Sequence, residues 1–344
     1  MPRTELLEVN DPRWADLAAS HPNALPFHHP AWVGLVRDCY RFRSFAAAVS
    51  APDGSLSAGV PVVEVRDPLR RRRWVSLPFT DHCPVISDSE AARDALLGLL
   101  REQAAAERVA SVELRTAVGS PPVPESVVGV LHELALGTDP DEVYRRFDKS
   151  RVQGSIRRAQ REGVTVRAAD CEDDVAGTYY DLQVRTRRRL GVPPQPRRFF
   201  RLLWERVIET GLGFVLLAHV DNSVIAGAVF LNWNRHLIYK FAASDEAHRK
   251  SQPNHAILWE AIRRGCELGC HTMDFGRSGP TDDGLRAFKS GWGAVERPLV
   301  YTTIVGSPRG AKESRAEDAL RGLLRRSPLW VCRGVGAALY RYAA

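Results

Sequence analysis

Basic residues occur at helical spacing between Lys149 and Arg161. Arg151 and Arg158 are seven residues apart, so a helix brings them to one wide face. The complete set is Lys149, Arg151, Arg157, Arg158 and Arg161. Guanidinium groups contact phosphate in a bidentate way, so this face could bind the backbone of an RNA stem or acceptor end. The alternative is a solvated face whose arginines pair with carboxylates such as Glu162.

The distribution of charge points to the same region. The formal net charge of the chain is +7. Residues 145–201 hold fifteen Arg and Lys against seven Asp and Glu, an excess of eight, so the rest of the chain is close to neutral. A local excess of this kind is typical of a surface that meets a polyanion, although a solvated helical surface also accounts for it. A second basic group flanks the loop Val192–Pro196 and comprises Arg185, Arg187, Arg188, Arg189, Arg197 and Arg198.

A second candidate for phosphate chemistry is the segment from Arg249 to Asn254. It lies between an expected strand, His236–Ala243, and an expected helix, Pro253–Leu268. Arg249 and Lys250 offer cations beside a helix N-terminus, which favours anions. The segment has no glycine, and Pro253 lacks one N–H donor. Because proline suits the first turn of a helix, an ordinary helix start is the alternative.

The elements that position these residues alternate between strand and helix patterns. In the second half, we expect helices at Ser150–Glu162, Val175–Leu190, Arg197–Thr210, Pro253–Leu268 and Asp283–Gly291, and strands at Val164–Arg167, Phe214–Val220, Val224–Trp233, Leu237–Ala243, Thr272–Phe275 and Pro298–Ile304. In the first half, we expect helices at Trp32–Tyr40 and Ser89–Ala106, and strands at Phe45–Ser50, Leu56–Val65, Arg73–Leu77 and Val109–Leu114. A tail follows, with a helix at Glu313–Arg326 and an apolar segment at 329–341. This order predicts a mixed α/β fold.

Several motifs resemble those of the GNAT-type N-acyltransferases and, more specifically, of the Fem family. They are Tyr-x-x-x-Ala-Ser (239–244), Pro253-Asn254, Asp-Phe-Gly-Arg-Ser (274–278) and Leu-x-x-Phe-Lys-x-x-Trp-Gly (285–293). Fem proteins are aminoacyl-tRNA-dependent transferases that build peptide bridges. The resemblance implies two tandem GNAT-like domains with a helical C-terminal tail. The corresponding ranges are 1–140 for the first domain, 141–306 for the catalytic domain and 307–344 for the tail.

The resemblance also implies roles for single residues. Lys289 would stabilise the oxyanion formed when an amine attacks an ester carbonyl, and Phe288 would pack beside it. The alternative for Lys289 is interaction with the C-terminal dipole of its own helix. Asp274 could orient a base or an amine, or hold Arg277 or the loop backbone. Substrate-binding positions implied by the resemblance are Arg37, Tyr239, Arg249, Lys250 and Asn254.

The resemblance leaves three functions open. The first is aminoacyl transfer from an aminoacyl-tRNA to an amine of a peptide or peptidoglycan precursor, which the glycine-free segment 249–254 favours over a coenzyme A donor. The second is an acyl-CoA-dependent N-acyltransferase acting on a sugar, a polysaccharide precursor or a metabolite. The third is a non-catalytic module that binds RNA or a membrane surface. A covalent acyl-enzyme is not indicated, because the chain has neither a Gly-x-Ser-x-Gly elbow nor a P-loop.

Composition adds further expectations. Six scattered cysteines lack a second paired cluster, so we expect reduced cysteines, no metal site and no bound cofactor beyond the co-substrate. The chain opens without a secretory signal and has no apolar run of about 20 residues, so we expect a cytoplasmic protein. The preference for Arg over Lys is typical of a GC-rich bacterial genome. The apolar tail with basic edges could pack on the second domain or contact a membrane surface. The sequence does not determine an oligomeric state.

Overall fold

The computed structural model describes residues 3–67, 70–119, 123–308 and 315–343. The chain divides into two compact units, neither of which is one continuous segment. Unit 1 comprises Met1–Gly129, Pro298–Ala311 and Arg341–Ala344, and unit 2 comprises Val130–Arg297 and Lys312–Tyr340. The domain boundaries predicted from the sequence are at 140/141 and 306/307. In the structure the chain changes unit at 129/130 and 297/298, and the tail helices belong to unit 2.

Unit 1 is a mixed sheet with helices. Its elements are β1 (Arg3–Leu7), α1 (Pro12–Ser20), η1 (Pro26–His28), α2 (Pro30–Tyr40), β2 (Arg43–Ser50), β3 (Leu56–Arg66), β4 (Arg72–Val75), β5 (Ile86–Ser87), α3 (Glu90–Ala106) and β6 (Ser111–Leu114). The sheet order is β1-β2-β3-β4-β6, and the unit 1 part of β13 (Val295–Val305) pairs antiparallel with β6. Ser89 caps α3 by accepting a hydrogen bond from the Ala92 N–H, as serine at this position favours. Gly54, at φ +89°, completes the predicted turn between β2 and β3.

Unit 2 contains a further run of paired strands, both parallel and antiparallel. Its elements are β7 (Glu125–Ala135, which enters from unit 1), α4 (Pro140–Arg145), η2 (Lys149–Gln153), α5 (Gly154–Arg161), β8 (Thr165–Ala168), η3 (Asp174–Tyr179), α6 (Tyr180–Leu190), α7 (Arg197–Leu203), η4 (Trp204–Ile208), β9 (Gly213–Val220), β10 (Ser223–Trp233), β11 (His236–Ser244), η5 (Glu246–Ser251), α8 (Pro253–Glu267), β12 (Thr272–Ser278), α9 (Asp283–Gly291), α10 (Arg315–Arg326), α11 (Leu329–Leu339) and η6 (Tyr340–Ala343, which continues into unit 1). The strand order is β7-β12-β11-β10-β9-β8.

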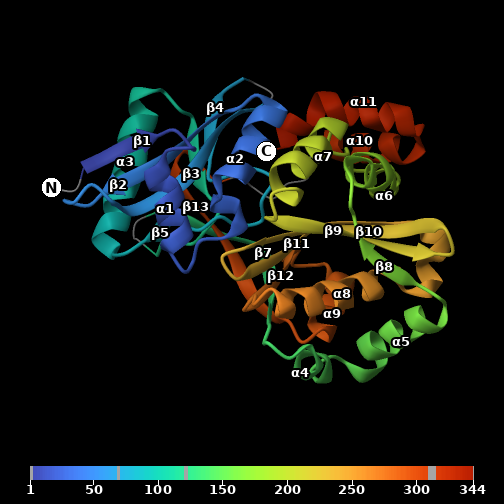
Figure 1. Ribbon diagram of the computed structural model, residues 1–344. Helices are drawn as coiled ribbons and strands as arrows, with labels where there is room; N and C mark the ends of the chain where they lie inside the picture. The colour runs from blue at the N-terminus through green and yellow to red at the C-terminus, as the bar shows by residue number, and fades with distance from the viewer. Residues whose placement is uncertain (1–2, 68–69, 120–122, 309–314, 344) are drawn as a thin grey trace. The chain divides into compact units, whose positions relative to one another are not determined.

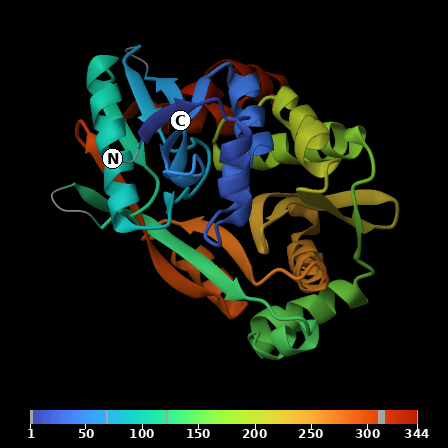
Figure 2. The same ribbon diagram turned by 60° about the vertical axis from the view of Figure 1, so that its left-hand side comes forward.

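Helices cover both faces of the unit 2 sheet. Figures 1 and 2 show α5 and α8 on one side of strands β9 and β10, with α6 and α7 on the other. Ile156 of α5 and Leu258 of α8 share a core with Phe214 and Phe230 of the strands. On the other face, the Tyr179 ring packs directly against Gly227 of β10. A Cβ atom at this position would lie only 2.8 Å from the ring. The sheet therefore separates two surfaces of unit 2.

The tail helices pack on α6. Arg333 of α11 forms an ion pair with Asp181 of α6 at 2.8 Å. Gly336 faces the Pro194 carbonyl so closely that a Cβ atom would lie 2.2 Å from it. Leu324 and Cys332 are fully buried. These contacts agree with the expectation that the tail packs on the second domain; positions 313 and 314 of the expected tail helix lie outside the described residues.

Most predicted elements are present, with several additions. The structure adds β1, α1, β5, β7 and α4. Three expected helices contain a π turn, namely η2, η3 and η4. Within the described residues, none of the helices has both the length and the apolar character needed to cross a membrane.

Candidate acyl-transfer site

The central strands of unit 2 part after three residue pairs. Parallel pairing of β11 with β12 runs from His236 opposite Thr272 to Ile238 opposite Asp274. Beyond these pairs, β11 continues to Ser244 and β12 to Ser278. Both strands are irregular there. The register of β10 with β11 shifts between Val229 and Phe230, and that of β12 with β7 shifts between Asp274 and Arg277. Such bulges often lie next to active sites, because they turn backbone groups and side chains away from the ladder.

Asp274 and Lys289 meet at the β12 bulge. Oδ1 of Asp274 accepts a hydrogen bond from the Gly276 N–H at 2.6 Å. Nζ of Lys289, on α9, donates to the carbonyls of Gly276 and Arg277 at 2.7 and 2.9 Å. Both side chains are buried, with Lys289 only 3% exposed. Gly276 has φ +74°, a conformation that glycine adopts without strain. Two catalytic candidates from the sequence therefore both form hydrogen bonds to the backbone of Gly276 in one bulge.

An aromatic cluster surrounds this bulge. Phe288 lies edge-on to His255, and His255 stacks on Trp292 with ring centroids 5.6 Å apart. Tyr239 stacks on Phe230 and meets Phe275 edge-on, which places it where β11 and β12 part. Burial raises the pKa of the Tyr239 hydroxyl, so the group stays protonated at neutral pH. Burial lowers the pKa of His255 to about 4, so this imidazole is neutral at pH 7.

The turn between β11 and α8 uses its own backbone donors. The Ala247 N–H bonds to Oδ1 of Asp245 at 3.0 Å, and the Gln252 N–H bonds to the Arg249 carbonyl at 3.2 Å. Gln252 is left-handed, at φ +57°, and α8 begins at Pro253, which has no N–H. Arg249 and Lys250 are exposed in this turn, and Asn254 is partly exposed in the first turn of α8. The cations of the turn are therefore accessible, whereas several of its amides are already engaged.

The predicted basic helix is present and exposed. It consists of η2 and α5, and Asp148 caps it by accepting from the N–H groups of Ser150 and Arg151. Its exposed basic residues are Lys149, Arg151, Arg157, Arg158 and Arg161. Arg158 lies 3.7 Å from Glu162, an exposed pair that contributes little. Ile156 and Ala159 face the core. The arginines are thus on the solvent side of an amphipathic helix, not among buried groups.

Arg37 belongs to unit 1, whereas the other candidate residues belong to unit 2. It lies on α2, and its Nε donates to Oδ1 of the neighbouring Asp38 at 2.7 Å. This hydrogen bond raises the pKa of Arg37. The guanidinium remains partly exposed.

One group of possible metal ligands occurs among the described residues. Oxygen and sulfur atoms of Asp170, Cys171 and Asp174 lie within 4.8 Å of one another. Asp174 is held by the Arg167 guanidinium, which lowers the pKa of that carboxyl. Since a guanidinium already neutralises the carboxylate, the group does not form a favourable cation site.

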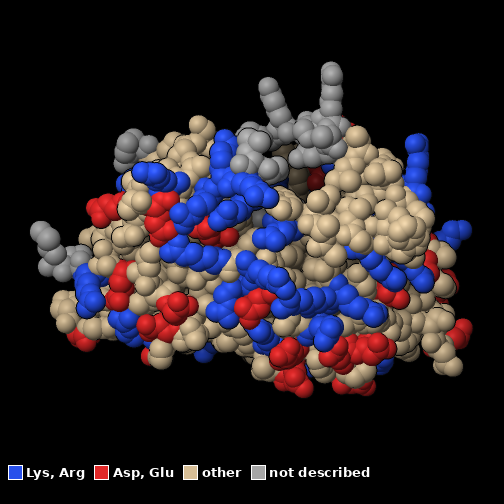
Figure 3. Space-filling model, turned by 90° about the horizontal axis from the view of Figure 1, so that it is seen from above, with Lys and Arg blue, Asp and Glu red and all other residues tan. Residues whose placement is uncertain are grey.

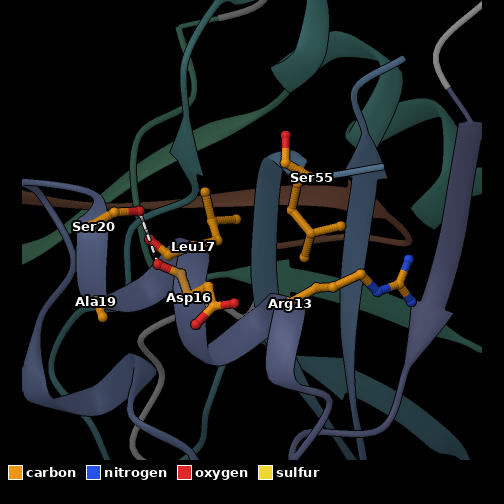
Figure 4. A pocket seen from close by; sticks show the side chains of 7 residues that line it. Arg13, Asp16, Leu17, Ala19, Ser20 and Ser55 are labelled. Atoms are coloured by element: carbon orange, nitrogen blue, oxygen red, sulfur yellow. Dashed lines mark hydrogen bonds between the residues drawn. The ribbon is translucent and has the colours of Figure 1, made fainter. Parts of the chain in front are cut away.

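Figure 4 shows a cavity in unit 1 between α1 and the turn at Ser55. The Ser20 hydroxyl donates to the carbonyls of Asp16 and Leu17. The Arg13 guanidinium extends toward β1, where Nη1 donates to Oε1 of Glu5 at 2.9 Å. The polar groups of this cavity therefore stabilise the local structure. They do not converge on a point where a reaction could take place.

Comparison with known proteins identifies the fold. Residues 146–290 match the family model described as an acetyltransferase (GNAT) domain. The crystal structure of FemX superposes with a TM-score of 0.73 at 17% identity and covers 88% of this chain and 97% of that chain. Residues 146–290 therefore resemble a GNAT domain, and the fold of the chain is similar to that of FemX. This confirms the predicted fold class.

Two other structures share the fold at lower similarity. The C-terminal domain (DUF2156) of a putative lysylphosphatidylglycerol synthetase from Agrobacterium fabrum has a TM-score of 0.57 at 14% identity, covering 86% of this chain and 92% of that chain. A tandem GNAT protein from the clavulanic acid biosynthesis pathway has a TM-score of 0.50 at 14% identity, covering 90% of this chain and 100% of that chain. No curated protein sequence matches the chain.

Sequence reasoning missed several parts of the site. The parting of β11 and β12 depends on strand register, which no local pattern reveals. His255 directly follows the Pro-Asn helix start, so the sequence indicates that it lies beside the loop. The sequence does not indicate that aromatic rings surround it. The arginines on α6 are visible in the sequence, whereas the closeness of Arg325 on α10 to Arg185 and Arg188 is not.

Proposed function

We propose that this protein is an N-acyltransferase that moves an aminoacyl group from an aminoacyl-tRNA to an amine of a peptide or peptidoglycan precursor. The GNAT domain and the FemX-like fold support acyl transfer. The reaction would take place in the cytoplasm, where charged tRNA is available. The choice of donor rests on the turn between β11 and α8.

That turn is the observation that carries the proposal. A pyrophosphate cradle needs several backbone N–H groups that point at one anion. Here the N–H groups of Ala247 and Gln252 are bonded within the turn, and Pro253 has none. The side chains of Arg249 and Lys250 are exposed instead. Side-chain cations suit the spaced phosphodiesters of an RNA end better than a compact pyrophosphate.

The proposed mechanism is direct attack of the acceptor amine on the ester carbonyl of the donor. A new C–N bond forms, the C–O bond to the ribose oxygen breaks, and the amine proton passes to the leaving alkoxide or to solvent. The protein contributes positioning and charge stabilisation. We propose the Lys289 ammonium as the cation near the oxyanion, fixed at the β12 bulge by its two carbonyl partners. In the alternative supported by the same hydrogen bonds, Lys289 and Asp274 only hold the bulge.

A second candidate is acyl transfer from an acyl-CoA. The observation that favours it is the match to an acetyltransferase domain over residues 146–290. The two candidates share the acceptor amine and differ in the donor. They are separated by the response of donor binding to salt, because a long polyanion releases many counterions.

The test is a transfer assay with radiolabelled aminoacyl-tRNA and radiolabelled acetyl-CoA in parallel. We expect transfer from the charged tRNA to peptide or cell-wall precursor amines, with donor affinity falling by about 10³ or more between 50 and 200 mM salt if six or more phosphates are contacted. Transfer from acetyl-CoA alone, with salt-insensitive micromolar affinity and no tRNA binding, would replace the first candidate with the second. Absence of transfer from both donors would favour the non-catalytic module.

A further inference from the structure

A cavity of about 480 Å³ lies between the end of β11, the last turns of α6 and the end of α10. Its lining residues are Arg185, Arg188, Arg189, Ser244, Asp245, Glu246 and Arg325. Four of the seven are arginines from two helices that are distant in sequence. Figure 3 looks down on the side of the molecule that carries α6, α7, α10 and α11, and many Lys and Arg side chains gather there.

Few carboxylates of the protein neutralise the arginines of this cavity. Arg185, Arg188 and Arg325 have no carboxylate within ion-pair distance among the described side chains. Nε of Arg188 is buried and has no hydrogen-bond partner in that part of the chain. Arg189 lies 3.7 Å from the exposed Glu246. A buried N–H without a partner costs about 1–3 kcal/mol, so a ligand gains from this donor only if the Arg188 side chain turns Nε toward the cavity.

The carboxylate of Asp245 does not neutralise the cavity. Its Oδ1 accepts from the Ala247 N–H, and its Oδ2 lies 3.9 Å from Nδ1 of His248. Asp245 thus serves the first turn of η5. Four cationic groups face two carboxylates, and one of these is held by the backbone. The site is therefore cationic overall.

Specific packing builds the cavity. The Thr186 hydroxyl accepts from the Ser244 N–H at 3.1 Å, which fixes α6 to the last residue of β11. Gly191, after α6, faces Arg321 of α10 so closely that a Cβ atom would lie 2.4 Å from its Cγ. Leu324, next to Arg325, is fully buried. Arg325 therefore lies at a defined place opposite Arg185 and Arg188.

Helix ends give an alternative reason for these arginines. The last turns of α6 and α10 are both basic, as the helix dipole favours. That effect acts on each helix separately and does not require the side chains to converge. Arg326 occupies the same turn of α10 and is exposed but does not line the cavity. The helix dipole favours Arg325 and Arg326 alike, whereas an anion in the cavity would depend on Arg325 only. Arg326 therefore serves as the control that distinguishes the dipole effect from anion binding.

We propose that this arginine cavity binds a phosphodiester or pyrophosphate oxyanion at the nucleotide end of the acyl donor. This inference rests on the proposed function, because it assigns the donor's phosphate to the end of β11. Guanidinium groups from two helices can hold one phosphate through bidentate hydrogen bonds. The cavity and the basic helix α5 lie on opposite faces of the unit 2 sheet, as Figure 1 shows. The cavity is thus a separate anion site, and variants can address it alone.

The test compares Arg185→Gln/Arg325→Gln with the control Arg201→Gln/Arg326→Gln. Both pairs remove two exposed arginines from unit 2, so they change net charge equally. The probes are deacylated tRNA, coenzyme A, inorganic pyrophosphate and vesicles containing anionic phospholipid. We expect the cavity variant to bind tRNA at least about ten-fold more weakly at 50 mM salt, with a salt slope smaller by roughly 1.4 for two contacts to a single strand. The control should keep the wild-type affinity and slope.

The outcomes separate this inference from the proposed function. If coenzyme A or pyrophosphate, and not tRNA, binds in an Arg185- and Arg325-dependent way, the cavity assignment stands and the tRNA proposal fails. If the cavity variant binds every soluble probe as the control does while transfer from charged tRNA continues, the proposed function stands and the cavity assignment is overturned. Dependence on the two arginines for vesicle binding alone overturns it as well. Arg188→Lys, which keeps the charge but loses the Nε donor, should also weaken binding.

Discussion

Replacement of Lys289 by methionine tests the β12 bulge most directly. The Lys289 ammonium donates to two carbonyls, at 2.7 and 2.9 Å, from an almost fully buried position. Methionine fills similar space but leaves both carbonyls without this donor. The Gly276 carbonyl is buried, and such an unsatisfied group costs about 1–3 kcal/mol. Arg277 is exposed, so water can reach its carbonyl more easily.

We therefore expect Lys289→Met to lower the free energy of unfolding by about 2–4 kcal/mol, since hydrogen bonds to charged groups contribute about 1.5–3 kcal/mol each and loss of the ammonium's desolvation cost offsets part of this. Urea unfolding measures the change. Lys149→Met, at an exposed lysine, is the control and should change stability by within about 0.5 kcal/mol. A cost for Lys289→Met no larger than that of the control would refute the structural reasoning.

Single-turnover rates on the folded variant then test the catalytic role. If the ammonium stabilises the oxyanion, Lys289→Met lowers the rate by on the order of 10²–10³ and leaves the donor Kd nearly unchanged. Lys289→Arg should recover stability and rate only in part, because a planar guanidinium cannot occupy the same point. An unchanged single-turnover rate would remove Lys289 from the chemistry and leave it as the group that holds the bulge.

Three further predictions concern other parts of unit 2. Charge reversal of Arg157 and Arg158 should weaken tRNA binding at low salt and cost only about 0.5 kcal/mol of stability, since both are exposed; unchanged binding in a filter assay would exclude this face. Gly336→Ala should destabilise by about 1–3 kcal/mol because the Pro194 carbonyl occupies the space, whereas Gly334→Ala, with open space, should stabilise by about 0.5–1 kcal/mol in urea melts; equal effects would contradict the packing of α11. The pKa of His255 is about 4 in the folded protein, so the unfolded chain binds a proton at this residue at higher pH than the folded protein does. The contribution of neutral His255 to the free energy of unfolding is therefore complete above pH 6.5. It is lost as the pH falls toward 4, by up to about 3 kcal/mol. Stability of His255→Gln should therefore fall less steeply over that range, and parallel pH curves would show that the site does not depress the pKa.

The sequence predicted elements where local signals agree. The helix Asp283–Gly291 has the predicted bounds, and Gly293 follows it at φ +79°. The helix expected at Ser150–Glu162 begins with a π turn, and both Val152 and Ile156 lie in the core. Hydrophobic periodicity does not distinguish such a turn from regular helix.

The strand β7 escaped prediction, and the geometry of the site depends on it. Its first residues, from Glu125, alternate between exposed and partly buried, so the hydrophobic pattern is weak until Leu131. The bulge of β12 exists only relative to β7. For this reason the sequence could propose Asp274 and Lys289 separately but could not show that they meet at Gly276. The same limit applies to Arg325, whose closeness to Arg185 follows from helix packing between distant segments.

The order of the segments has a consequence for synthesis on the ribosome. Unit 1 includes Pro298–Ala311, and β6 pairs with the part of β13 between Thr302 and Val305. The strand order of unit 1 is therefore incomplete until residue 305 has emerged, and at about 5–20 residues per second this takes roughly 9–35 s after residue 129. During that interval β6 has an open edge, which is a hazard for pairing with other chains. We expect nascent unit 1 to need protection until unit 2 has been translated, so that the first unit to begin synthesis is not the first to finish folding.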